Sequence, residues 1–136
     1  MELVVDTSIV VAALLRSGTT RSLLFNPQFK LFSPERVETE IVKNKEKFKQ
    51  LGNFTEEQFF EAVAIVMKQM EITAFEDYKI LEKEARIVCK RDESDWPFVA
   101  LALKLDLPIW SADPDILEGQ RRVKVVSTPE LLKIIF

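Results

Sequence analysis

The stretch Glu2-Leu3-Val4-Val5-Asp6-Thr7-Ser8 is an apolar segment that leads directly into a carboxylate and two hydroxyls. Its pattern predicts a short buried strand over residues 2–5, followed by a residue suited to cap a helix. In open α/β sheets, ligands bind outside the carboxyl ends of the parallel strands. Asp6 therefore lies where a ligand site is expected, and other carboxylates that return to this edge would complete such a site.

Short apolar strands alternate with helices along the rest of the chain, which predicts a parallel sheet covered by helices on both faces. We expect one domain over residues 1–136, a three-layer α/β/α fold with four to five short strands in its central sheet. The block from 33 to 90 has little strand signal and is expected to form a lobe to one side. Strands are predicted at 2–5, 30–32, 71–73, 108–110 and 123–126, and helices at about 9–15, 20–25, 34–50, 55–70, 75–90, 98–105, just after 114 and after 129.

Local signals mark where several helices begin and end. Ser17-Gly18 stops the first helix, and Pro34 is expected in the first turn of the third, where its missing N–H costs nothing. Thr55 and Gln58 form a capping box for the fourth helix. One face of the third helix carries residues at 3.6-residue spacing, namely Val37, Ile41, Asn44 and Phe48.

The composition narrows the chemistry that is available. The 136 residues carry a net charge of −3, one cysteine and no histidine. Without histidine, Ser-His-Asp and Cys-His catalysis and His-ligated zinc are excluded, so carboxylates and hard metal ions become the natural candidates. Cys89 reads as a small buried hydrophobe, and a lone cysteine is compatible with a reducing cytoplasm. No leader and no apolar run of ~18 residues is present, so neither secretion nor a membrane span is expected.

Two acids follow two predicted strands. Asp6 comes directly after the first strand, and Asp113 comes three residues after the strand ending at Trp110. Each has an ordinary alternative role, a helix cap for Asp6 and a turn or cap before Pro114 for Asp113. Both must emerge at one edge of a parallel sheet, and this coincidence favours a shared site.

Other segments bring further acids. Glu40 is the acid nearest the buried face of the third helix, with a boundary salt bridge as the equal alternative. Asp95 precedes a strongly apolar helix, and capping by Ser94 or Asp95 would be a sufficient structural reason for it. Asp92 lies three residues earlier. Clustered carboxylates repel by ~4 kcal/mol per close pair, and Mg²⁺ or Mn²⁺ bound by oxygen ligands would relieve this repulsion.

These pieces resemble the PIN-domain family of metal-dependent ribonucleases, close to the small prokaryotic type that includes VapC toxins. The resemblance spans nearly the whole chain. It rests on Val4-Val5-Asp6-Thr7-Ser8-Ile9, on Glu40, on the segment 95–102 that begins Asp95-Trp96-Pro97, and on Trp110-Ser111-Ala112-Asp113-Pro114-Asp115.

The resemblance implies a site for Mg²⁺ or Mn²⁺ that cuts single-stranded RNA. The matching acidic quartet, expected to be catalytic and to bind metal, is Asp6, Glu40, Asp95 and Asp113. Asp115 matches a further acid, which would bind a second metal ion or orient the other ligands, and Asp92 is an alternative to Asp95 or an extra metal ligand. Thr7 or Ser8 would orient Asp6. Ser111 stands where Thr is more usual in the family, a change expected to be harmless.

Two other functions stay open. A PIN-like scaffold could bind RNA or protein without cutting, although its clustered charges would then have no use. A phosphatase of the haloacid dehalogenase type needs an acid two residues after Asp6, where Ser8 stands. The family precedent also implies a possible antitoxin partner, a homodimer and a cytoplasmic location. Candidate cations for RNA are Arg16, Arg21, Lys43, Lys45, Arg121, Arg122 and Lys124.

Overall fold

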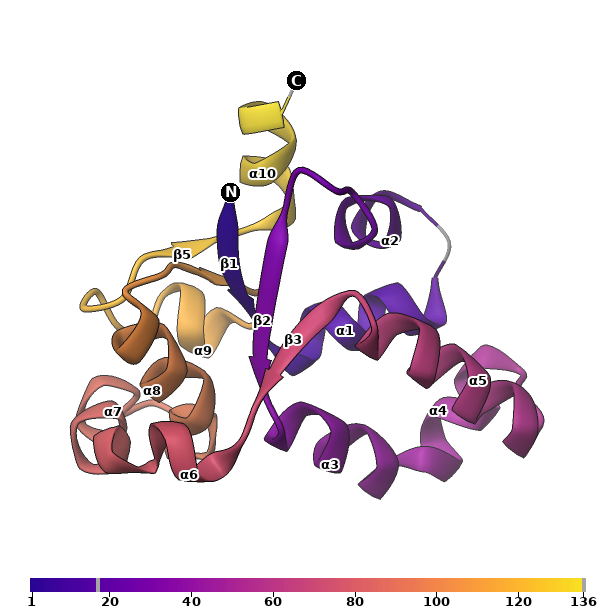
Figure 1. Ribbon diagram of the computed structural model, residues 1–136, viewed down its shortest axis with the longest axis horizontal. Helices are drawn as coiled ribbons and strands as arrows, with labels where there is room; N and C mark the ends of the chain where they lie inside the picture. Colours follow the sequence, from indigo (N-terminus) through magenta and orange to yellow (C-terminus); the bar gives the residue numbers. More distant parts are fainter. Residues whose placement is uncertain (17, 136) are drawn as a thin grey trace.

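A computed structural model describes residues 1–16 and 18–135 of the chain, so Ser17 of the predicted helix stop lies outside the described residues. Its five strands form one fully parallel sheet in the order β3-β2-β1-β4-β5 (Figure 1). The strands are β1 (Glu2–Val5), β2 (Lys30–Pro34), β3 (Met70–Thr73), β4 (Ile109–Trp110) and β5 (Val125–Val126). The predicted parallel sheet and its strand positions are confirmed.

Helices and short 3₁₀ turns (η) connect the strands. They are α1 (Thr7–Leu15), α2 (Thr19–Leu24), α3 (Arg36–Lys43), α4 (Lys45–Gly52), α5 (Glu56–Met67), α6 (Phe75–Tyr78), η1 (Lys79–Leu81), α7 (Glu82–Val88), η2 (Glu93–Asp95), α8 (Trp96–Leu105), α9 (Pro114–Leu117) and α10 (Thr128–Ile135). None of the helices in the described part of the chain is long and apolar enough to cross a membrane.

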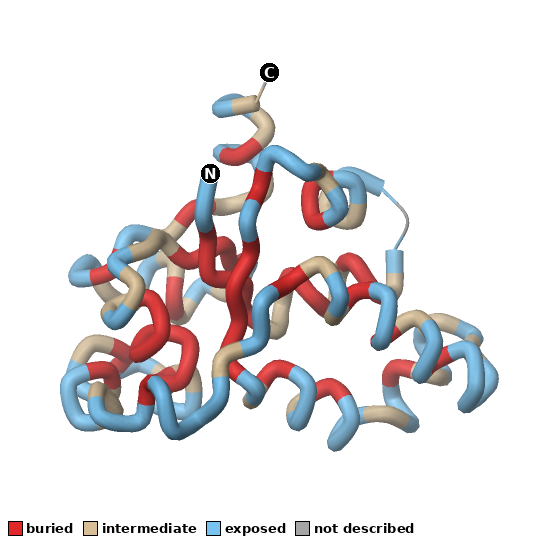
Figure 2. The backbone as a smooth tube through the Cα atoms, viewed as in Figure 1, coloured by how far each residue is buried: buried red, intermediate tan, exposed pale blue. Residues whose placement is uncertain are grey.

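The core divides into two layers because successive residues of a strand face opposite sides of the sheet. Leu3 and Val5 of β1 pack with α1, α3, α4 and α5, whereas Val4 between them packs with α7 and α8. Figure 2 shows the buried residues concentrated along β1, β2 and α8. The three-layer α/β/α prediction is therefore confirmed.

The block from 33 to 90 does not form a lobe to one side, so that prediction is wrong. β3 lies within this block and pairs with β2 at the edge of the sheet. Helices α3 to α5 join the core layer on one face, and α6 and α7 join the layer on the other (Figure 1). The block therefore wraps around the β3 edge and covers both faces.

Two of the predicted helices are interrupted. The helix expected over 34–50 breaks at Asn44, which has φ −102° and ψ 23°, and whose side-chain amide donates to the Glu40 carbonyl at 2.8 Å. Asparagine competes in this way with the helical hydrogen bonds.

Pro34 ends β2 rather than starting the helix. The helix expected over 75–90 is divided by η1. The capping box of Thr55 and Gln58 is present as predicted.

Candidate metal centre

Asp6 is buried at the carboxyl end of the central strand β1, with 3 % of its surface exposed. Its Oδ1 accepts from the Ile9 N–H at 3.2 Å and from Ser8 Oγ at 2.6 Å, and its Oδ2 accepts from Ser111 Oγ. Asp6 thus caps α1, as the ordinary alternative predicted. Burial raises its pKa to about 6, although these hydrogen bonds act in the opposite direction.

Hydroxyl groups join the turn after β1 to the turn after β4. Ser8 Oγ accepts from the Ala112 N–H at 3.0 Å, and Ser111 Oγ accepts from the Asp113 N–H at 2.9 Å. Asp113 in turn accepts from the Asp115 N–H at 2.9 Å and so begins α9. Ser8 and Ser111 therefore hold Asp6 and place it beside the segment that carries Asp113.

Glu40 lies on α3 and faces the same edge. Its Oε2 accepts from Thr7 Oγ1 at 2.7 Å, and its Oε1 lies 3.4 Å from Arg36 Nε. The sequence offered Thr7 or Ser8 as the hydroxyl that orients Asp6. The structure assigns these hydroxyls to different acids, because Ser8 contacts Asp6 whereas Thr7 contacts Glu40.

Asp95 occupies the residue before α8, yet its side chain makes no capping hydrogen bond. Its buried Oδ2 has no hydrogen-bond partner within the described part of the chain. Burial, and then the nearby charges of Asp113, Asp92, Asp6 and Glu40, raise its pKa to about 7. The predicted capping role does not explain this side chain, and a buried carboxylate oxygen without a partner calls for another explanation.

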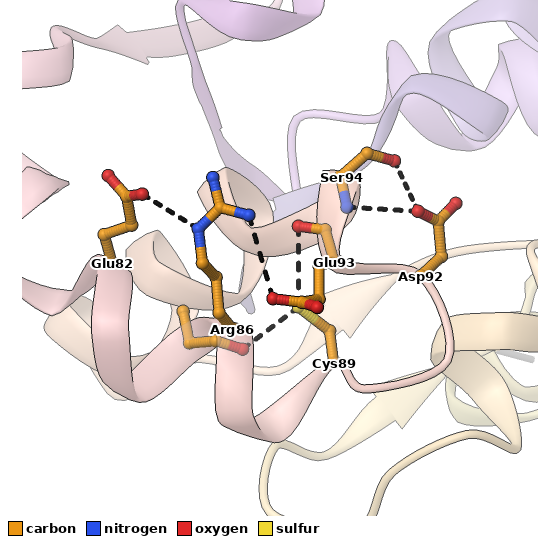
Figure 3. A network of polar contacts seen from close by, with 7 residues as sticks. Glu82, Arg86, Cys89, Asp92, Glu93 and Ser94 are labelled. Carbon is orange, nitrogen blue, oxygen red and sulfur yellow. Dashed lines mark hydrogen bonds and ion pairs between the residues drawn. The ribbon is translucent and has the colours of Figure 1, made fainter.

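Asp92, the alternative to Asp95, is already engaged. Its Oδ1 accepts from the Ser94 N–H at 3.0 Å and from Ser94 Oγ at 2.6 Å, which begins η2. Figure 3 shows this pair beside Arg86, which donates to Glu82 at 2.8 Å and lies 3.8 Å from Glu93. These contacts join the turn that precedes α8 to α7.

Cys89 lies in the same cluster, and its thiol donates to the Ala85 carbonyl at 3.0 Å (Figure 3). Burial raises its pKa to about 11, which keeps the thiol neutral and unreactive. The interpretation of Cys89 as a buried small hydrophobe agrees with this environment.

The acids converge, but they do not form a closed set of ligands. Within residues 1–16 and 18–135, no group of three or more acids lies close enough together to hold a metal ion. Other groups of the protein hold them instead. The hydroxyls of Ser8 and Ser111 contact Asp6, and Glu40 is contacted by Thr7 and Arg36. Arg91 Nε lies 3.3 Å from Asp115 Oδ1. These oxygen donors, together with an Asp95 Oδ2 that has no partner in residues 1–16 and 18–135, fit a hard divalent cation, which would compete with the contacts just named.

Two arginines next to the acids were missed in the sequence. Arg36 stands four residues before Glu40, a spacing that signals an ion pair on one helix, whereas no spacing signals the pairing of Arg91 with Asp115. Three predicted RNA-binding cations are engaged elsewhere. Arg21 donates to the Ala13 and Leu14 carbonyls, Lys45 pairs with Glu56, and Arg122 pairs with Glu84.

The raised pKa values of Asp6 and Asp95 predict how stability depends on pH. Both carboxyls bind protons more tightly in the folded protein than in the unfolded chain. The metal-free protein is therefore expected to lose stability as the pH rises from about 4 through 7, by about 3 kcal/mol for Asp6 alone. Urea unfolding with a chelator present, at pH 4.5 to 8, measures this loss. If the stability of Asp6→Asn depended on pH in the same way as that of the unaltered protein, Asp6 would not be a source of this dependence.

Comparison with known proteins identifies the family of the chain. No curated protein matches the chain. A family model described as PIN domain matches residues 4–130, a range that contains every predicted site residue from Asp6 to Asp115. PIN domains are generally nucleases and typically use divalent metal ions. The match confirms the resemblance found in the sequence at the level of the family, and the chain belongs to the PIN-domain family.

Proposed function

We propose that the protein is a metal-dependent endoribonuclease that hydrolyses single-stranded RNA. In this proposal Mg²⁺ or Mn²⁺ is held at the carboxyl edge of the sheet by Asp6, Glu40, Asp95 and Asp113. The main support is the buried Oδ2 of Asp95, which has no hydrogen-bond partner among the described residues and lies near the charges of other acids. A protein keeps such a costly arrangement where a cation compensates it.

The chain's own residues prepare the site. A divalent cation there would activate water and offset negative charge on the phosphate. Ser8 and Ser111 fix both oxygens of Asp6, and Thr7 fixes one oxygen of Glu40, so these carboxylates are oriented before a ligand arrives. With its pKa near 7, the Asp95 carboxyl gains or loses a proton around neutral pH, and a bound cation would favour the charged form.

Replacing Asp95 with asparagine tests the proposal, with Asp106→Asn as the matched control. Asp106 is an exposed acid at the C-cap of α8, at the opposite end of that helix, with φ 55°, a conformation that asparagine accepts. We expect Asp95→Asn to weaken saturable Mn²⁺ binding at least ~10-fold and RNA cleavage at least ~100-fold, because the buried charge is lost. Calorimetry and a cleavage assay measure both, and Asp106→Asn should match the unaltered protein.

A different result would favour the scaffold alternative. If the unaltered protein binds RNA but shows neither saturable Mn²⁺ binding nor cleavage, the acids are not a working metal site. Equal Mn²⁺ binding by Asp95→Asn and the unaltered protein would remove Asp95 from the ligand set. The antitoxin partner, the homodimer, the cytoplasmic location and the closeness to VapC toxins stay predictions.

A further inference from the structure

Phe75 is a partly exposed aromatic residue at the same edge of the sheet as the acids. It begins α6, just after β3 ends at Thr73. Thr73 lies opposite Pro34, so the end of β3 is beside the start of α3, the helix that carries Glu40. The Phe75 N–H donates to Glu35 Oε1 at 3.0 Å, which fixes this proximity.

Two buried aromatic rings hold Phe75 in place. Its ring centroid lies 5.7 Å from that of Tyr78 and 6.0 Å from that of Trp96, with steep interplanar angles of 83° and 73°. Trp96 directly follows Asp95, so this aromatic cluster adjoins the acids at a second point. Phe75 is 37 % exposed, whereas Tyr78 and Trp96 are buried. A ring that is fixed in advance loses little conformational freedom when a ligand contacts it.

Cationic groups lie close to this cluster. Arg36 follows Glu35 and is paired with Glu40, with 41 % of its side chain exposed. The Arg86 guanidinium lies 5.5 Å from the centre of the Trp96 ring. It also pairs with Glu82 and Glu93, and 41 % of its side chain is exposed. An exposed aromatic ring near cations is the combination that binds unpaired nucleotides, because the ring stacks on a base while the cations attract phosphates.

We propose that Phe75 is a base-stacking platform, which holds one unpaired base of single-stranded RNA next to the site of cleavage. This inference rests on the proposed function and adds to it the means by which single strands are selected. Bases within a duplex are stacked on one another and cannot be placed on a protein ring without being unpaired. Stacking also tolerates any base, so Phe75 favours an unpaired nucleotide over a particular sequence.

Binding of a fluorescent single-stranded RNA to Phe75→Leu tests the platform. Ca²⁺ replaces Mn²⁺ to slow cleavage, and a gel checks that the RNA stays intact. We expect Phe75→Leu to weaken binding roughly 5- to 100-fold and Phe75→Trp to restore it, because stacking needs a flat ring. Phe25→Leu is the matched control. Phe25 is 39 % exposed, but it lies before β2, near the amino ends of the strands and away from the acids at their carboxyl ends.

A series of RNAs with one abasic nucleotide distinguishes stacking from a general loss of structure. The RNA whose abasic nucleotide occupies the stacked position should bind equally well to Phe75→Leu and to the unaltered protein. Mn²⁺ binding by Phe75→Leu should be unchanged. Binding of intact RNA by Phe75→Leu within about twofold of the unaltered protein overturns the platform. The platform is also overturned if Phe75→Leu weakens binding by the same factor for every abasic RNA, whatever the position of the abasic nucleotide. If the unaltered protein binds RNA without cutting it, the nuclease proposal fails while the platform is still decided by these variants.

Discussion

Asp6→Asn is expected to reduce RNA cleavage by about 1000-fold and to stabilise the folded protein above pH 6. Asparagine keeps the shape of the side chain but removes the charge that a metal ion would need. It also removes a buried carboxyl whose pKa burial raises to about 6, so the cost of ionising it at neutral pH disappears. A variant that is more stable and yet inactive is the signature of a residue kept for chemistry.

Cleavage rates in Mn²⁺ and urea unfolding at pH 7.5 measure the two effects. Asp106→Asn again serves as the control, and it should change neither quantity. Cleavage by Asp6→Asn at the unaltered rate would reject Asp6 as a metal ligand. A loss of both activity and stability would instead assign Asp6 to the structure of the turn before α1.

Ser111→Ala is expected to weaken Mn²⁺ binding about 10- to 100-fold and to lower the free energy of unfolding by about 1–3 kcal/mol. The Ser111 hydroxyl donates to Asp6 Oδ2 and accepts from the Asp113 N–H. Its removal therefore leaves the buried Asp6 oxygen and the partly buried Asp113 N–H without this partner. The pKa of Asp6 should then rise further, since the hydrogen bond from Ser111 lowers it.

Ser111→Thr is the control for this change, because it retains the hydroxyl and adds only a methyl group. It should preserve Mn²⁺ binding and cleavage, in keeping with the expectation that serine and threonine are interchangeable here. Calorimetry, unfolding and cleavage rates decide the matter. If Ser111→Ala retains full metal affinity, the hydroxyl does not position Asp6 for a ligand.

Much of the fold could be predicted because strand pattern and topology constrain each other. Alternating strands and helices imply a parallel sheet, and a parallel sheet brings every strand's carboxyl end to one edge. Asp6 and Asp113 are consequently adjacent in the structure, as their positions after β1 and β4 predict. The absence of histidine in the sequence by itself excludes imidazole chemistry at this edge.

The local contacts at the edge could not be predicted, because they depend on side-chain directions that spacing does not define. Thr7 and Ser8 are neighbours, yet they contact different acids. Asn44 fits the apolar stripe by periodicity, but its amide binds a carbonyl and ends α3. Capping rules predict a satisfied side chain at Asp95, whereas its Oδ2 has no partner in the described part of the chain because of how η2 meets α8.

The hydrogen bond from Ser111 to Asp6 joins residues 105 positions apart in the chain, so it determines when the site can assemble during synthesis. A nascent chain that has emerged as far as residue 100 already contains Asp6, Glu40 and Asp95. It lacks β4, the neighbour of β1, and the serine that holds Asp6. Closing so long a loop has an entropic cost, and the contacts that offset it cannot form until β4 and Ser111 have been made. This edge of the sheet therefore completes its assembly only after β4 and Ser111 have been made, and a nascent chain that stops before them lacks the assembled site.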